Sequence, residues 1–406
     1  MSILNSLSEK ILWDEFYQKK EAQGNLHPSE LKALSEYISE ERYKPLVESI
    51  LAGQPLSLPT RHLINKVGKS KKRVVYTYNQ DENYVLKLLT HLLYRYDDAF
   101  PDNLYSFRRH FGVRRAFSDL TARKAISRMY SYKVDIQNYF NSGDIDLCIS
   151  EMKDVITDDP LLVQFIEMLL REDRVIYNGE VISDRHGMMA GVPISSFLAN
   201  VYLRRMDQYF EEKDIPYARY SDDILVFATD PEKLSQYVQI IKTFLRDYGL
   251  TINPEKEVCT RPGEAWTFLG LQYKGGVIDI APVSVKKVKA KFRRKARALL
   301  RWKRKKGLQN IHVVKAFIHY INRFFCCNDD HEEMTWTRWY FPLITTDKSL
   351  KVLDQYTLEL IRYLMTEKHQ KSNYNFRYDA IKALGYQPLV TAYYRERKKH
   401  EKQKND

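Results

Sequence analysis

The strongest constraint on the fold of this chain is one segment, residues 286–306, that carries the whole excess of positive charge. The chain has 406 residues, with 65 Lys and Arg against 52 Asp and Glu, a formal net charge of +13. Residues 286–306 contain 13 Lys and Arg and no acidic residue, so the rest of the chain is balanced. The segment therefore predicts a long helix with one buried and one densely cationic face. The apolar positions at helical spacing are Val288, Phe292, Ala296, Leu299 and Leu300.

A cationic face of this density suits a polyanion such as a nucleic acid. Lys and Arg that contact phosphates release the counterions condensed around a nucleic acid, and this release drives binding. Two less specific interpretations stay open: a solvated surface helix, or a helix that lies on a membrane surface. Because so many like charges on one helix repel one another without a counter-polyanion, we favour a nucleic-acid partner.

The composition is that of a globular protein with packed parts. Hydrophobic residues make up 44% of the chain and charged residues 29%, unlike a disordered protein. Only 15 residues are Gly, so long flexible linkers are not expected. The four cysteines form no C-x-x-C pair, which argues against a zinc ribbon or a disulfide framework. The sequence shows neither a signal-peptide pattern nor an apolar run of membrane-spanning length, so we expect a cytoplasmic protein.

The order of helical and strand patterns predicts an α+β domain with a small antiparallel sheet, followed by an all-α region. Residues 1–60 read as helices, with a helix start at Pro28. Asn178-Gly179 between two apolar runs predicts a type I′ hairpin over residues 174–183. The other expected elements are helices at 81–100, 195–210, 232–248, 311–326 and 349–366, a basic turn joined to a short strand within 69–80, a strand at 132–136, two strands around a two-acid turn within 217–228, a hairpin at 266–281 that turns at Gly275-Gly276, and a polar, basic tail from Arg395.

Two sites place carboxylates where their mutual repulsion should be unfavourable. Asp222 and Asp223 are adjacent at the tip of a predicted hairpin with apolar flanks, and Asp135 interrupts an apolar strand pattern. If these strands are neighbours in one sheet, three carboxylates converge, and divalent cations would offset their repulsion. Oxygen ligands suit Mg²⁺, and a pair of ions about 3.5–4 Å apart can serve a nucleotidyl transfer. The simpler alternative is a polar hairpin loop without chemistry.

Several segments resemble, in chain order over residues 60–330, the motif boxes of reverse transcriptases. Tyr220-Ser-Asp-Asp223 resembles the Tyr-x-Asp-Asp box of that family. The other matching segments are the fingers arginine in Lys-Lys-Arg-Val-Val-Tyr (71–76), a template-side segment of bacterial members in Leu-Tyr-Ser-Phe-Arg (104–108), the first catalytic box in Lys-Val-Asp-Ile-Gln-Asn-Tyr-Phe (133–140), the following helix in Gly-Val-Pro-Ile-Ser-Ser-Phe-Leu-Ala-Asn-Val-Tyr-Leu (191–203), the motif lysine Lys256, and the primer-grip hairpin in Phe-Leu-Gly-Leu (268–271).

The resemblance implies a right-hand polymerase of fingers, palm and thumb, and it implies a role for each matching residue. Two Mg²⁺ ions would be bound by Asp135 and Asp222, with Asp223 completing the site. The incoming deoxynucleoside triphosphate would be held by residues of the nucleotide pocket, and Lys256 would protonate the leaving pyrophosphate. The pocket residues are Lys72, Arg73, Phe140 and Gly191.

Simpler interpretations of these residues stay open. Arg73 also fits a solvated turn, Phe140 a core position at the end of a strand, and Lys256 a surface loop. If Phe140 does lie under the sugar, its ring leaves no room for a 2′-hydroxyl and selects deoxynucleotides. The cationic segment 286–306 would be part of the thumb and grip the RNA–DNA duplex.

One stretch departs from the family pattern. Many members have Pro-Gln-Gly before the second helix, whereas this chain has Met-Met-Ala-Gly at residues 188–191. The usual glutamine contact to the nucleotide is therefore missing, with Ala190 in its place. The departure puts fidelity and template dependence in doubt and leaves the metal site untouched.

The length leaves little room for further catalytic domains. We expect an N-terminal helical segment (1–60), fingers and palm (61–281), a basic helical thumb (282–330) and a helical C-terminal extension with a basic tail (331–406). The chain resembles bacterial defence-associated reverse transcriptases, which implies an anti-phage role and a structured non-coding RNA template. A retron enzyme is the second choice, because Phe268-Leu-Gly replaces the Val-Thr-Gly typical of retrons. The reverse transcriptases of group II introns resemble this chain as more distant relatives.

Three further hypotheses stay open. The chain could be an RNA-binding module with a vestigial polymerase site, although all three acids are present. It could be an RNA-directed RNA polymerase, although Phe140 speaks against that. Priming from a protein hydroxyl is a third possibility, since 29 Tyr residues offer candidates. The oligomeric state is open as well.

Overall fold

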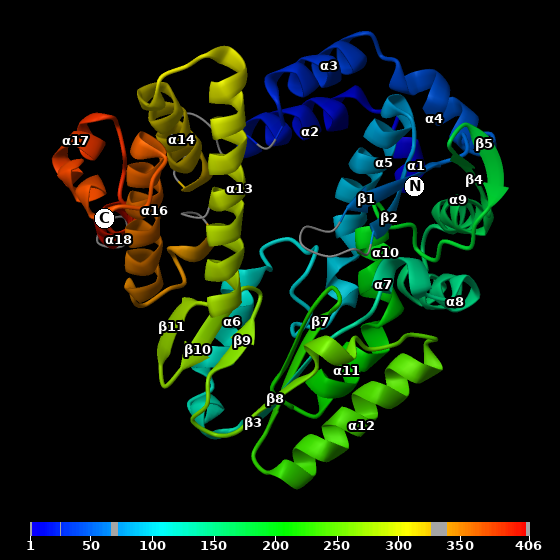
Figure 1. Cartoon of the computed structure of the whole chain (residues 1–406). Coiled ribbons are helices and arrows are strands. Elements are labelled where there is room, and N and C mark those ends of the chain that lie inside the picture. The colour runs from blue at the N-terminus through cyan, green and yellow to red at the C-terminus, as the bar shows by residue number, and fades with distance from the viewer. Residues whose placement is uncertain (1, 25, 66–71, 326–338, 403–406) are drawn as a thin grey trace. The chain divides into compact units, whose positions relative to one another are not determined.

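A computed structural model describes residues 2–24, 26–65, 72–325 and 339–402 (Figure 1). The chain divides into two compact units, the first made of residues 1–22 and 26–262 and the second of residues 263–406 together with 23–25. Each unit has its own sheet and helices. Within the described residues, no helix is both long and apolar enough to cross a membrane.

Helices open the first unit, as the sequence predicts. They are α1 (Ile3–Ser6), α2 (Lys10–Gln23), α3 (Pro28–Ser39) and α4 (Tyr43–Leu51), followed later by α5 (Gln80–Leu92) and the 3₁₀ helix η1 (Leu93–Ala99). The predicted start at Pro28 is confirmed: His27 and Glu30 form a reciprocal capping box around it. Aromatic packing joins these helices, with Trp13 stacked on Tyr43 at 4.8 Å between ring centroids.

A four-stranded sheet with the order β2-β1-β4-β5 lies beside these helices. Its strands are β1 (Thr60–Asn65), β2 (Lys72–Thr77), β4 (Arg174–Tyr177) and β5 (Glu180–Ser183). The predicted hairpin turn is confirmed, since Asn178 and Gly179 connect β4 to β5 with φ angles of 52° and 88°. Both values lie in the left-handed region that a type I′ turn requires.

A second four-stranded sheet, with the order β6-β7-β3-β8, forms the centre of the first unit. Its strands are β3 (Tyr130–Asp135), β6 (Tyr217–Tyr220), β7 (Asp223–Ala228) and β8 (Val258–Thr260). Residues 224–227 of β7 are completely buried, as an unbroken apolar run predicts for a central strand. β3 lies between β7 and β8 and runs antiparallel to both, which places chain segments about 90 and 125 residues apart side by side.

Helices complete the first unit around the central sheet. They are α6 (Val113–Ala122), η2 (Ile126–Arg128), α7 (Tyr139–Ser142), α8 (Ile145–Val155), α9 (Pro160–Arg171), α10 (Ser195–Tyr202), α11 (Arg204–Glu212), α12 (Pro231–Asp247) and η3 (Pro254–Lys256). The single helix expected over 195–210 is wrong in one respect, because Leu203 separates α10 from α11. Aspartate side chains begin α8, α9 and α12 by accepting hydrogen bonds from the first turn.

The second unit begins with a three-stranded sheet of β9 (Trp266–Phe268), β10 (Leu271–Lys274) and β11 (Val277–Ile280). The predicted turn at Gly275-Gly276 joins β10 to β11. The expected two-stranded hairpin is incomplete, however, because β9 also pairs with β10. The helices of this unit are α13 (Pro282–Lys306), α14 (Asn310–Phe325), α16 (Lys348–Thr366), η4 (Lys371–Asn375), α17 (Tyr378–Ala383) and α18 (Leu389–Lys402).

The cationic segment is a helix, and all five predicted stripe residues of α13 are buried. Gly307 ends α13 in the left-handed conformation that favours glycine at this position. The polar, basic tail expected from Arg395 is helical as far as Lys402, because it continues α18.

Candidate active site

The central sheet brings two of the predicted acids into register. Asp135 ends β3 and Asp223 begins β7, and their Cα atoms are direct antiparallel partners. The backbone carbonyl of Asp222 accepts a hydrogen bond from the Ile136 amide at 2.9 Å, so the third acid lies at the same end of the sheet. The turn between β6 and β7 is tight: Ser221 adopts φ = 58°. Asp135, Asp222 and Asp223 therefore gather at one point, although 87 residues separate Asp135 from Asp222 in the chain.

Burial and mutual repulsion make this end of the sheet unfavourable for full ionisation. Burial raises the pKa of Asp222 to about 6, and the charge of Asp135 and then that of Asp223 add to the increase. Burial also raises the pKa of Asp223, but Lys133 opposes that effect. Asp222 is thus the acid whose negative charge is least compensated.

Two lysines lie against the other two acids. Lys256, in η3, forms an ion pair with Oδ2 of Asp135. Lys133 lies two residues before Asp135 on β3, and its Nζ is 3.2 Å from Oδ1 of Asp223. Asp222 forms no ion pair with any residue that the structure describes. The structure therefore places Lys256, a predicted catalytic residue, beside the acids, whereas Lys133 was not predicted.

The carboxylates of the three acids are suitable ligands for hard cations, although their arrangement is not a complete metal-binding site. Over the described ranges, no three His, Cys, Asp or Glu side chains are grouped as a metal-ion site. Carboxylate oxygens are the ligands that Mg²⁺ prefers, and the uncompensated charge on Asp222 would be neutralised by a cation. The two lysines hold positive charge where further cations would otherwise reside, so metal binding would require the lysine contacts to rearrange.

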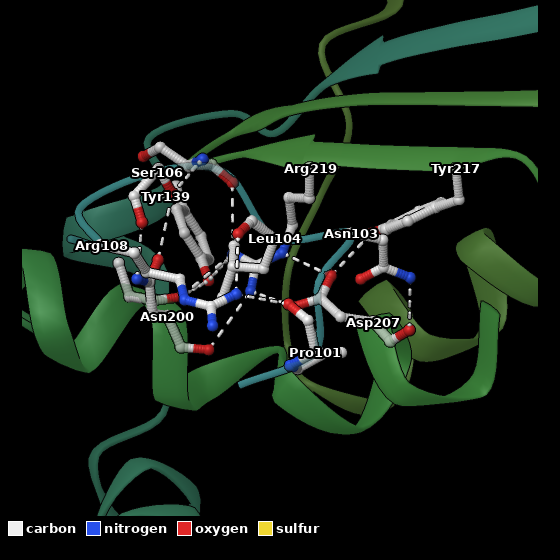
Figure 2. Close-up of polar contacts among 12 residues, drawn as sticks. Pro101, Asn103, Leu104, Ser106, Arg108, Tyr139, Asn200, Asp207, Tyr217 and Arg219 are labelled. Carbon is white, nitrogen blue, oxygen red and sulfur yellow. Dashed lines mark hydrogen bonds and ion pairs between the residues drawn. The ribbon is translucent and has the colours of Figure 1, made fainter. Parts of the chain in front are cut away.

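A completely buried arginine fixes the hairpin that carries Asp222. Figure 2 shows Arg219, on β6, directed at the carboxylate of Asp207 on α11. Its Nε donates to Oδ1 at 2.8 Å, and a second guanidinium nitrogen donates to Oδ2. The same guanidinium also donates to the carbonyls of Ala199 and Asn200, each at 3.2 Å. This network joins α10, α11 and β6, so the turn has little freedom to shift.

A second contact holds the turn itself. The Ser221 amide donates to the hydroxyl of Ser106 at 2.9 Å, and that hydroxyl donates to the side chain of Asn200 at 3.0 Å. Residues 104–108 were expected to be a template-side segment. In the structure, their first residues pair with β6: the Tyr105 amide donates to the Arg219 carbonyl at 2.9 Å.

An aromatic chain leads from the hairpin to Phe140. The rings of Tyr220 and Phe107 have centroids 6.4 Å apart, and Phe107 and Phe140 are separated by the same distance. Phe140 lies in α7, which follows the strand that ends at Asp135. The predicted nucleotide-side residue is therefore connected to the acidic hairpin through one intervening ring.

Lys72 and Arg73 belong to a different sheet from the acids. Both are exposed at the start of β2, in the other sheet of the first unit. Gly191, in the loop before α10, packs against this strand. It adopts φ = 103°, and a Cβ atom there would lie 2.9 Å from the Tyr76 carbonyl oxygen of β2. Gly191 thus permits close backbone packing against β2, and its place in the nucleotide pocket stays a prediction.

Asn141 makes a bridge that sequence reasoning missed. Its side chain donates to the Val74 carbonyl of β2 at 3.1 Å and accepts from the Ala190 amide at 2.8 Å. The Ala190 carbonyl in turn accepts from the Tyr76 amide at 2.8 Å. The unusual alanine is therefore buried, and its backbone is fully engaged between β2 and α7.

The site residues that the sequence analysis did not predict differ in whether the sequence carries a signal for them. Lys133 had a signal, because residues two apart on a strand share a face and it therefore accompanies Asp135. The sequence carried no signal for Arg219 and Asp207, because a charged residue within a strand pattern does not reveal a partner on a distant helix. The sequence carried no signal for Asn141 either, because it is an ordinary polar residue that follows Phe140.

An α+β unit that gathers acids at a hairpin between antiparallel strands is characteristic of a nucleotidyl-transferring polymerase. The family model described as "Reverse transcriptase (RNA-dependent DNA polymerase)" matches residues 64–273 of this chain. The match covers a little over half of the 406 residues, and the chain belongs to the reverse transcriptase family. The predicted α+β polymerase fold is thereby confirmed.

Comparison with solved structures finds yeast telomerases at low identity. Apo telomerase from Candida tropicalis is 12% identical with a TM-score of 0.47, and 82% of this chain is covered. Telomerase from Candida albicans in complex with a fragment of telomeric RNA is 14% identical with a TM-score of 0.45, and 86% of this chain is covered. This chain spans 60% and 66% of those two chains. Likenesses this weak do not bear on its function, and no curated protein matches it.

Proposed function

We propose that this protein copies a partner RNA into DNA at the acidic hairpin, with Asp135, Asp222 and Asp223 holding two Mg²⁺ ions. The observation that carries the proposal is the register of Asp135 with Asp223 beside Asp222, whose charge is uncompensated. Mg²⁺ bound there would favour loss of the proton from the primer 3′-hydroxyl and offset charge on the departing pyrophosphate. The chain's own residues would supply position and protons.

The lysine beside Asp135 fits the role of a proton donor. Lys256 lies within ion-pair contact of that carboxylate and would be released from it as cations enter. An ammonium freed at this position could give its proton to the pyrophosphate as the phosphate bond breaks. Lys72 and Arg73 would hold the triphosphate from β2, a role that suits two exposed cations on a hairpin.

Phe140 would select deoxynucleotides. Its ring is partly buried and held by Phe107, which also contacts the residue that precedes the acidic turn. A ring fixed in this way would exclude a 2′-hydroxyl by its volume. The cationic face of α13 would bind the phosphates of the RNA–DNA duplex.

The polymerase proposal is tested by primer extension on a defined RNA template with Mg²⁺ and deoxynucleotides. We expect the wild-type protein to extend the primer and Asp222→Ala to abolish extension. Asp98→Ala is a matched control, because Asp98 also belongs to an Asp-Asp pair but is exposed. Extension by Asp222→Ala at the wild-type rate would show that the assigned acid does not bind the metal ions, and would favour another site.

We further propose a bacterial cytoplasmic enzyme that acts in anti-phage defence with a structured non-coding RNA. Resemblance of the sequence motifs is the support for this part. Purifying the protein from its native locus and sequencing the bound RNA and copied DNA tests it. One abundant structured RNA with matching complementary DNA is the expected result. RNA covalently joined to single-stranded DNA would instead favour a retron enzyme.

A further inference from the structure

A cavity of about 730 Å³ lies within the second unit, and the proposed polymerase chemistry does not use it. It is formed between α13, α16 and the segment that contains η4. Its volume is in the range typical of small-ligand sites. Residues that carry positive charge or an aromatic ring dominate its lining: Arg293, Arg297, Tyr356, Arg362, Tyr363 and Tyr374.

The cavity has a net positive charge, because three arginines line it against one acidic residue, Glu359. Arg293 donates from Nε to the Tyr356 hydroxyl at 3.3 Å, and Arg362 donates to the Phe376 carbonyl at 3.2 Å. In the part of the chain that the structure describes, no carboxylate forms an ion pair with Arg293, Arg297 or Arg362. Since a guanidinium presents several donors in one plane, these groups match the oxygens of a phosphate.

The aromatic residues provide flat surfaces beside the charge. Tyr363 stacks on His369, with ring centroids 4.6 Å apart and planes inclined by 17°. Tyr374 is 63% exposed, and the Arg362 guanidinium lies 5.0 Å from the centre of its ring. An exposed aromatic face next to unpaired arginines is a suitable platform for a nucleobase.

We propose that this cavity binds an unpaired nucleotide of single-stranded RNA, with its base on the aromatic surfaces and its phosphate on Arg293 and Arg297. The inference rests on the proposed function in one respect, because it takes RNA as the partner. Glu359 is the acidic member of the lining, and its carboxylate would accept from the amino group of adenine, cytosine or guanine.

A nucleotide within a chain fits better than a free nucleotide. Arg301 and Lys305 follow Arg297 at four-residue steps on α13, which places cations about 6 Å apart along one side of the helix. This row leads out of the cavity, where it would meet the phosphates of neighbouring nucleotides. A free nucleotide would leave those cations unused.

The test measures binding of fluorescent octaadenylate to the full-length protein by fluorescence anisotropy. Arg293→Gln with Arg297→Gln should raise Kd by at least about tenfold, because two charge-assisted contacts are lost. Tyr374→Leu should raise Kd by about fivefold or more through lost stacking. The matched control, Lys287→Gln with Arg294→Gln, removes the same number of exposed charges from α13 outside the cavity lining and should raise Kd far less than the cavity pair, because only non-specific attraction to phosphates is lost.

Three results would overturn the proposal. An equal loss of binding in the control pair would show that only the overall charge of α13 matters. Unchanged binding by Tyr374→Leu, with unchanged thermal unfolding, would remove the base platform. Adenosine monophosphate that competes as strongly as octaadenylate would assign the cavity to a free nucleotide.

The same variants separate this inference from the polymerase proposal. Primer extension on an exogenous duplex depends on the acids, whereas octaadenylate binding depends on the cavity. A protein that extends primers but whose cavity variants bind octaadenylate normally contradicts the cavity alone. A protein that binds through the cavity without extending primers contradicts the polymerase proposal alone.

Discussion

Replacing Asp222 by asparagine should stabilise the metal-free protein while it abolishes polymerase activity. Burial and the neighbouring acids raise the pKa of Asp222 from 3.8 to about 6. Since one pKa unit corresponds to about 1.4 kcal/mol, ionised Asp222 lowers the free energy of unfolding at pH 7 by about 3 kcal/mol at most. Asparagine keeps the shape of the side chain and removes its charge, so the variant should regain much of this stability.

The sign of the effect fixes its pH dependence. Because the pKa of Asp222 is higher in the folded protein, protonation favours folding. The stability that protonated Asp222 gives to the folded protein is fully present below about pH 3.8 and is lost as the pH rises through about 6. The advantage of Asp222→Asn should therefore be greatest at pH 7 and shrink towards pH 4. Urea unfolding in the presence of EDTA across this range measures it.

Asp223→Asn is the matched control. The pKa of Asp223 is also raised by burial, but Lys133 compensates its charge and would lose its partner. We therefore expect a smaller gain in stability for Asp223→Asn than for Asp222→Asn. Mg²⁺ at a hundred times its Kd should add about 2.7 kcal/mol to the wild-type protein and far less to Asp222→Asn. Equal or lower stability of Asp222→Asn at pH 7 without metal would refute the reasoning.

Three further substitutions test the surroundings of the acids. Arg219→Met leaves Asp207 charged and completely buried, so urea unfolding should show a loss of about 3–5 kcal/mol, and adding Asp207→Leu should recover part of it. Phe140→Ala should increase ribonucleotide use relative to deoxynucleotide use by about tenfold or more in kcat/KM, and an unchanged ratio would exclude the sugar-gate role. Gly191→Ala should lower stability by about 1–3 kcal/mol, because its φ is 103° and its Cβ would collide with β2. Gly249→Ala, at φ = 65° with open space around the Cβ position, should show a smaller loss, and an equal loss would contradict the packing argument.

Local patterns predicted the elements that depend on local chemistry. The five stripe residues of α13 are buried because their helical spacing places them all on one face of the helix, and that apolar face packs away from water. Asn178-Gly179 made a hairpin because few other dipeptides accept two left-handed conformations in succession. The break at Leu203 had no such signal, since neither Pro nor Gly marks it.

The candidate site was only partly accessible from the sequence. The motif resemblance predicted Asp135, Asp222 and Asp223 as site residues, but the pairing of β3 with β7 joins distant parts of the chain and no local pattern contains it. The ion pair between Arg219 and Asp207 depends on how α11 packs against β6, so only the structure reveals it.

The cavity of the second unit was hidden for the same reason. It requires Arg293 and Arg297 of α13 to meet lining residues of α16 and η4 that lie 59 to 81 positions further along the chain.

Crystallography with Mn²⁺ and a non-hydrolysable deoxynucleotide on a primed RNA template tests the central claim most directly. Anomalous scattering should reveal two ions about 3.5–4 Å apart, both ligated by Asp135 and Asp222. Lys256 should then have left its contact with Asp135. A complex with bound nucleotide but no ion beside these two carboxylates would contradict the account.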